Sequence, residues 1–302
     1  MIINSESIKA LNKGFQNRFL GAVGKVNRDA EKLAMKTTSS QAAEVYGDIA
    51  FFPAMRKLVG DAVVKNLKEV AHTVPNEEFE ATVRVKQADI ERDALGIYTP
   101  KIQGLGNTGA KLPSRLIADL LMGGFVGKDY TGTAFFAANK KHFPGGKKTF
   151  TNLGTKKLSA ANYQIAREAI RSVLDEDGNP LELGDQLALV VSPAYEATGR
   201  AILVSEKVNG GDDNVNKGTA ELIVLPRLAA AEDNWFLVDI GQPMGALILQ
   251  EERALELLTS ATGMTTEALI MTHAYLWQAY WRGNAAYGLP QLAYGSTGAD
   301  AA

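Results

Sequence analysis

The chain has 302 residues and a formal net charge of −2, with 46% of its residues hydrophobic and 22% charged. This composition is ordinary for a folded globular protein and argues against disorder as the dominant state. The charge balance argues against a protein that holds nucleic acid electrostatically, because such proteins carry a basic excess on one face. A weakly charged surface that merely encloses nucleic acid is compatible with this charge balance.

The chain contains no cysteine, which excludes disulfides, thiolate nucleophiles and Cys-ligated metals. Its N-terminal segment lacks the apolar run of a signal peptide. No stretch approaches the roughly 18 consecutive apolar residues of a membrane-spanning helix. The sequence therefore predicts a soluble protein made in a cytoplasm, with no membrane partner.

The first predicted element is an amphipathic helix over residues 5–22. Its apolar residues recur at helical spacing and are Ile8, Leu11, Phe15 and Phe19. This helix could lie in the core of its own domain. Because a polar stretch follows at 36–41, it could instead be an arm that packs on a neighbouring chain.

Residues 62–87 predict a long two-stranded β-ribbon. In its second strand, Phe79 and Val83 belong to an apolar row that alternates with a polar row containing Arg84 and Lys86, the period of a half-buried strand. The turn is expected at 74–77, where proline presets φ. A lone hairpin is only marginally stable in water, so the ribbon should lie against its own domain or another chain.

A helix is predicted over 99–125, with Thr99 as its N-cap and Pro100 at its first position. Pro113 should kink this helix or divide it in two. Residues 126–157 are rich in glycine, lysine and asparagine and predict mostly loop.

A second helix is predicted over 160–174, capped by Ser159, and another should start at Pro193. Short apolar runs predict buried strands at 187–191, 220–225, 235–240 and 246–249. An exposed, mobile loop is expected at 209–218. These elements predict a compact α/β subdomain over 185–262.

The last predicted element is a long strand with an aromatic face. Its residues of one parity are Leu269, Met271, Tyr275, Trp277 and Trp281. Periodicity alone does not exclude a helix in this segment.

Two motifs resemble ligand-binding loops but lack features that such loops require. Residues 104–109 match the glycine pattern of dinucleotide-binding loops, but no buried strand precedes them. Small residues that let another backbone pass close to a helix are the favoured interpretation. Residues 175–179 begin like a calcium loop, yet Pro180 stands where glycine is required and Gln186 where a bidentate glutamate is required.

Asp89, Glu91 and Asp93 form an acidic cluster, for which a solvated surface is favoured over a metal site or a patch for a basic neighbour. The three histidines lie in different predicted elements without metal-site spacing. Nucleophile-elbow and P-loop motifs are missing from the sequence. The sequence therefore predicts no catalytic residue, no cofactor and no metal, and a protein that is not an enzyme.

The order of elements resembles that of the Hong Kong 97-type major capsid proteins of tailed phages. The amino-acid sequence itself resembles the Mu-like gpT major head subunits. The resemblance is strongest at 60–67, 79–83, 89–93 and 96–98. It is weaker at 130–136 and 283–288, and the lysine-rich segment 137–150 departs from the family.

This resemblance implies an α+β fold whose parts follow one another along the chain. They are an N-terminal arm with the start of the peripheral domain (1–58), an extended β-ribbon loop (59–90), a peripheral domain with a spine helix at 99–125 (91–184), an axial domain (185–262), and a return strand with a tail (263–302).

The implied function is a head subunit that assembles into pentamers and hexamers of an icosahedral shell, around double-stranded DNA that it does not recognise specifically. Implied partners are a portal, a scaffolding or protease protein and a decoration protein. The expected intersubunit residues are Phe15, Phe19, Phe79, Val83, Arg84, Lys86, Asp89, Glu91 and Asp93. The nearest alternative is an encapsulin-like nanocompartment shell, and a distant one is a soluble dinucleotide-binding α/β enzyme.

Overall fold

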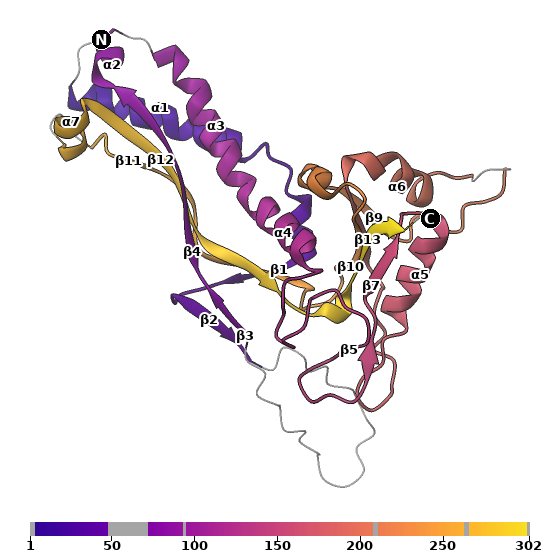
Figure 1. The fold of residues 1–302 in the computed structure, drawn as a ribbon. Coiled ribbons are helices and arrows are strands. Elements are labelled where there is room, and N and C mark those ends of the chain that lie inside the picture. The colour runs from indigo at the N-terminus through magenta and orange to yellow at the C-terminus, as the bar shows by residue number, and fades with distance from the viewer. Residues whose placement is uncertain (1–3, 48–71, 93–94, 208–210, 263–265, 301–302) are drawn as a thin grey trace.

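The computed structural model describes residues 4–47, 72–92, 95–207, 211–262 and 266–300. Two sheets organise these residues, and they lie side by side (Figure 1). An elongated half carries a four-stranded sheet in the order β1-β11-β12-β4, and the other half carries a five-stranded sheet in the order β7-β13-β10-β8-β9. Helices and strands mix within each half, so the fold is α+β.

The elongated half is built on two long antiparallel strands, β11 (Leu247–Thr259) and β12 (Ala274–Tyr287). The short strand β1 (Ala34–Thr38) pairs with β11 in parallel, and β4 (Glu77–Lys86) pairs with β12 in an antiparallel ladder. Within the described ranges, β4 pairs with β12 alone and therefore forms an edge of the sheet.

Helices cover one face of this sheet. They are α1 (Ser5–Val23), α3 (Thr99–Ala110) and α4 (Leu112–Gly123). The expected aromatic face of the late strand is confirmed for Tyr275, Trp277 and Trp281, which are all buried. Phe15 meets Trp277 edge to face, with ring centroids 5.0 Å apart. Helix α1 thus lies in the core of its own domain, and the arm interpretation is wrong for this conformation.

Pro113 divides the predicted long helix, because α3 ends at Ala110 and α4 begins at Leu112. The predicted N-cap of this helix is wrong by one residue. Its N-cap residue is Tyr98, without a side-chain cap, and the expected cap Thr99 is the first helical residue. The helix that precedes α3 is the short α2 (Gln87–Glu91), followed by one 3₁₀ turn at Leu95–Ile97.

The second half contains the continuously apolar strands that the sequence predicted. Strands β8 (Leu187–Val191) and β10 (Trp235–Asp239) are buried at every position, as in sheets covered on both faces. The sheet is completed by β9 (Glu221–Val224), β13 (Ala293–Asp300) and β7 (Leu153–Lys156). Two of these strands lie outside 185–262, so this sheet is not formed by that segment alone.

Helix α5 (Ala160–Arg171) and helix α6 (Glu196–Leu203) belong to this half. Ser159 accepts a hydrogen bond from the Asn162 amide and caps α5 as predicted. The helix expected at Pro193 starts as a 3₁₀ turn and continues as α6. The other short elements are 3₁₀ helices at Asp29–Leu33, Pro226–Ala231 and Pro290–Leu292, and the strand pair β5 (Lys140–Lys141) and β6 (Thr149–Phe150).

The predicted ribbon is partly wrong. Strand β4 does not turn back on the segment before it, because its partner is β12. The two-stranded ribbon of the structure joins β2 (Ala43–Tyr46) to β3 (His72–Pro75), so residues 74–77 link two sheets and are not a hairpin turn. Most of the first predicted strand, residues 62–71, lies outside the described residues.

Two smaller expectations need correction. The strand expected at 246–249 is the start of β11 and belongs to the four-stranded sheet. Leu269 and Met271 lie in helix α7 (Glu267–Thr272), ahead of the aromatic strand. The loop expected at 209–218 is exposed at most of its described positions, and within it the buried Asn214 amide donates to three carbonyl oxygens.

Candidate assembly surface

Among the described residues, helices cover one face of the four-stranded sheet and leave its other face and its β4 edge open (Figure 1). Along β4, one row of side chains packs toward the helices and contains Phe79 and Val83, which are half-buried. The opposite row is exposed and reads Glu78, Glu80, Thr82, Arg84 and Lys86. The predicted alternation is thus confirmed, and it places acidic residues at one end of the row and basic residues at the other.

Neighbouring strands support this exposed row with polar contacts. The Glu80 carboxylate accepts hydrogen bonds from Thr82 Oγ1 at 2.6 Å and from Gln278 Nε2 at 3.0 Å. These two donors hold the pKa of Glu80 below its usual value. Arg282 on β12 approaches Glu78 at 3.4 Å. Both glutamates of this row thus contact polar side chains of β12.

The far end of the elongated half, where β4 runs into α2, carries several of the predicted residues. Arg84, Lys86 and Glu91 line one groove of about 380 Å³ with α7 residues beside it. Arg84 donates a hydrogen bond to the Thr272 carbonyl oxygen, which ties β4 to the end of α7. Met271 on α7 is 76% exposed. This tip combines charge with exposed apolar area.

Two residues of the predicted acidic cluster, Asp89 and Glu91, make hydrogen bonds at the tip. The Asp89 carboxylate accepts a hydrogen bond from the Tyr98 hydroxyl, and Glu91 accepts one from Gln87. Asp93 lies outside the described residues. Within the described ranges, no three acidic or histidine side chains gather as possible metal ligands.

Phe15 and Phe19 are not part of this surface. Their exposed fractions are 3% and 0%, and they belong to the core under α3. They were expected at an intersubunit interface because helical periodicity identifies an apolar face without identifying what covers it. The correction is that the rest of the same chain covers them.

The glycines of 104–109 lie inside α3, where they cannot form a phosphate-binding turn after a strand. A Cβ placed on Gly106 would lie 2.7 Å from the Phe19 carbonyl oxygen. Gly106 therefore allows α1 to cross α3 closely, as the favoured interpretation predicted.

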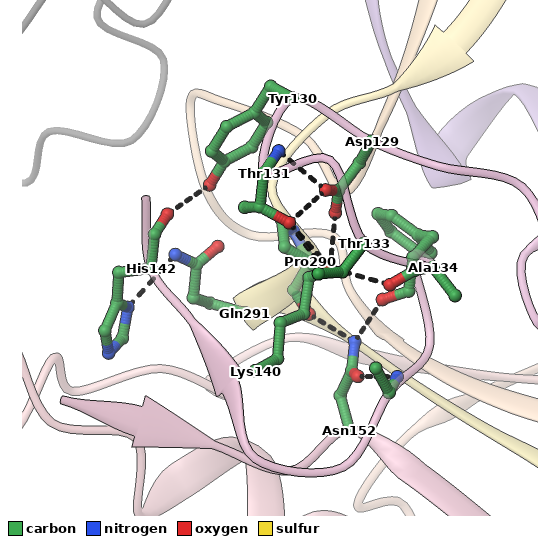
Figure 2. A network of polar contacts seen from close by, with 12 residues as sticks. Asp129, Tyr130, Thr131, Thr133, Ala134, Lys140, His142, Asn152, Pro290 and Gln291 are labelled. Carbon is green, nitrogen blue, oxygen red and sulfur yellow. Dashed lines mark hydrogen bonds and ion pairs between the residues drawn. The ribbon is translucent and has the colours of Figure 1, made fainter. Parts of the chain in front are cut away.

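A buried polar network anchors the lysine-rich segment (Figure 2). Lys140 and Asp129 form an ion pair of 2.9 Å with both side chains fully buried. The Lys140 ammonium also donates to Thr131 Oγ1 at 3.1 Å, Thr133 Oγ1 at 2.8 Å and the Ala134 carbonyl oxygen at 2.7 Å. With four oxygen partners, this charge is satisfied inside the protein.

Two further amides tie the network to the last 3₁₀ turn of the chain (Figure 2). Asn152 Nδ2 donates to the carbonyl oxygens of Phe135 and Pro290, both at 3.0 Å. Gln291 Nε2 donates to His142 Nδ1 at 3.1 Å, and burial lowers the pKa of His142. Sequence reasoning missed this network, because its members are separated by up to about half the chain and share no motif.

The remaining candidate motif is a turn. Asp175 Oδ1 accepts from the Asn179 amide at 2.8 Å, and its carboxylate closes the loop that ends α5. Among the described residues, no helix is both long and apolar enough to span a bilayer.

The two joined sheets, with a long strand pair under a divided helix, define a phage-capsid class of fold, the Hong Kong 97 type. The procapsid protein of bacteriophage JBD30 aligns over 97% of this chain and 76% of its own, with a TM-score of 0.60 and 23% identity. The virus-like particle protein from Pyrococcus furiosus aligns over 94% of this chain and 98% of its own, with a TM-score of 0.55 and 12% identity. At these identities the likeness shows the fold alone.

Sequence comparison is more specific. The model of the Mu-like prophage major head subunit gpT matches residues 8–156, 150–228 and 227–300, so the chain belongs to this family. The major capsid protein of Escherichia phage Mu is 34% identical over 142 residues, which are 47% of this chain and 46% of that protein. The Mu-like prophage FluMu major head subunit of Haemophilus influenzae is 25% identical over 134 residues, 44% of each chain. The matches thus span less than half the length of these two relatives.

Proposed function

We propose that this chain is the shell-forming head subunit of a Mu-like phage or prophage and that it acts as a structural protein without catalysis. The observation that carries the proposal is the match to the gpT family, which runs from residue 8 to residue 300. Copies of the chain would form pentamers and hexamers and close an icosahedral shell around double-stranded DNA, as part of a virion.

The surface chemistry supports enclosure without specific recognition of DNA. The net charge is −2, whereas affinity for DNA depends on many Lys and Arg contacts to phosphate. A portal, a scaffolding or protease protein and a decoration protein belong to the same proposal. One solved JBD30 capsid with the same fold is described as decorated with minor capsid protein trimers, and its identity to this chain is 20%.

The alternatives are weaker. A nanocompartment shell is compatible with the fold, which the Pyrococcus furiosus particle shares, but both curated relatives are phage or prophage head proteins. A dinucleotide-binding enzyme would use the 104–109 glycines, which lie within α3. Gene neighbours would distinguish a head subunit from a nanocompartment shell, because portal, terminase and tail genes would accompany a head subunit.

The direct test is expression of the full chain, alone and with the scaffolding gene of its own locus, followed by negative-stain electron microscopy and light scattering. We expect rings or closed particles. A monodisperse monomer or dimer in both preparations would overturn the proposal. Nuclease-protected double-stranded DNA in particles from an induced lysogen would support a phage head, and a packaged enzyme would favour the nanocompartment.

A further inference from the structure

The charge order along the exposed row of β4 is complementary to the same order read in the opposite direction. Read from the start of the strand, Glu78 and Glu80 are followed by Thr82, and then by Arg84 and Lys86. The two charges on one side of Thr82 are opposite in sign to the two on the other side. A second copy of the strand running in the antiparallel direction would therefore present a complementary charge at every charged position.

Strand β4 also has an unused edge. Its ladder to β12 runs from Glu77 to Lys86 and occupies one side of the strand. Among the described residues, no other strand pairs with β4. In an antiparallel strand with one partner, alternate backbone amides and carbonyls point away from that partner. Such a ten-residue edge is a template for another strand.

We infer that β4 is an isologous contact between two copies of this chain, in which the two β4 strands pair antiparallel about a two-fold axis at Thr82. Glu78 then faces Lys86 of the second copy and Glu80 faces Arg84, on both sides of the axis. On the helix-covered side, the half-buried Phe79 and Val83 face Val85 and Ala81 of the second copy. Opposite charges directly across two strands stabilise pairing, and like charges oppose it.

The register follows from the charges. A shift of the strands by two residues would place Thr82 opposite a charged residue and reduce the opposite-charge pairs from four to two. A shift by one residue would move the apolar row to the open face. Only the pairing centred on Thr82 combines four opposite-charge pairs with a continuous apolar face.

This inference rests on the proposed function and gives the contact a place in the shell. Adjacent members of a ring of five or six are related by rotation around the ring, so their contact joins two different patches. A contact of one patch with itself requires a two-fold axis. The β4 pairing would therefore join subunits of different rings.

Charge exchange tests the pairing in the full chain. The variant with Arg84→Glu and Lys86→Glu has an entirely acidic row, and the variant with Glu78→Lys and Glu80→Arg has an entirely basic row. Each variant alone should lose at least tenfold in the assembled fraction, measured by light scattering and microscopy. An equimolar mixture should regain assembly, and so should the single chain that carries all four exchanges.

Circular dichroism of each variant checks folding. Wild-type levels of assembly by both single-sign variants would overturn the pairing, as would folded variants whose mixture stays unassembled.

A cysteine link tests the axis itself, because the chain has no cysteine of its own. In either type of antiparallel residue pair, facing Cα atoms lie about 4.5–5.5 Å apart, within disulfide range. Thr82→Cys should therefore give a disulfide-linked dimer on mild oxidation. The matched control Glu80→Cys should give at least tenfold less, since two copies of residue 80 would lie about 13 Å apart. Mixing Glu80→Cys with Arg84→Cys should restore the link.

The two proposals fail separately. If the Thr82→Cys variant forms closed particles without a disulfide link between copies, the β4 pairing is overturned and the head-shell function stands. If the same variant forms the link but never forms rings or particles, the pairing is supported and the shell function is overturned. Absence of both the link and the particles would overturn both proposals.

Discussion

Two strands of this protein, one from each large sheet, bury their side chains to very different extents. Strand β8 in the five-stranded sheet is buried at all five positions and lies between β10 and β9. Strand β4 in the four-stranded sheet is buried at one position of ten, with its other positions half-buried or exposed. A central strand of one sheet is thus covered on both faces, whereas an edge strand of the other sheet leaves a row of side chains exposed.

This difference shows in the polar groups as well. Beside the five-stranded sheet, Asp129 and Lys140 are fully buried and form an ion pair with each other. The elongated half keeps its charges in water along β4 and β12, where single pairs are worth only about 0–1 kcal/mol. Buried charge rigidifies one subunit, whereas an ordered row of exposed charge can select a partner.

The largest expected effect concerns the buried ion pair between Lys140 and Asp129. Lys140→Met leaves the Asp129 carboxylate buried without its cation, and removing one partner of such a pair costs about 3–5 kcal/mol of unfolding free energy. Chemical denaturation measures it. The exposed neighbour gives a matched control, because Lys141→Met should change stability by less than about 0.5 kcal/mol.

The double variant Asp129→Asn with Lys140→Met sharpens the same point. Removing both charges should cost clearly less than Lys140→Met alone, since no buried ion remains uncompensated. Equal losses in the single and double variants would mean that packing, and not the ion pair, stabilises this loop.

A smaller change in stability is expected at Gly106 in α3, where α1 crosses closely. Gly106→Ala would place a methyl group 2.7 Å from the Phe19 carbonyl oxygen and should cost about 1–3 kcal/mol. Gly104 in the same helix has no atom within 4 Å of the same position, so Gly104→Ala should stabilise by about 1 kcal/mol. Thermal unfolding should therefore show opposite signs at two glycines one half-turn apart. The same sign at both positions would contradict the close crossing of α1 and α3.

The sequence was most informative where a local rule applies. Alternation in β4, the cap at Ser159, the break at Pro113 and the continuous apolar runs of β8 and β10 were all predicted correctly. Each depends on residues that are neighbours along the chain, so periodicity and capping chemistry are sufficient.

What the sequence did not predict depends on distant partners. The residues of β4 are as suited to a hairpin as to a ladder with β12, and the choice is made by residues about 200 positions away. The Lys140 network has the same origin, because Asp129, Asn152 and Gln291 meet only after folding. Phe15 and Phe19 show the converse, since an apolar stripe looks the same whether its own chain or another covers it.

The smallest expected effect is a pH dependence centred on the same buried network. Burial lowers the pKa of His142, although Glu176 and Asp175 act in the opposite direction. The unfolded chain takes up a proton near the ordinary histidine pKa of about 6.5, and the folded chain does not. The free energy of unfolding should therefore fall as pH drops through about 6.5, and the loss should stop below the folded-state pKa.

His142→Asn should reduce that slope, measured by urea denaturation at a series of pH values from about 8 to about 5, which brackets the ordinary histidine pKa. Well above that pKa histidine is neutral in both states, so any difference between variant and wild type there reflects packing and the lost bond from Gln291. The informative quantity is the change of that difference at lower pH. A difference that stays constant across the series would mean that His142 is not the group whose protonation opposes folding.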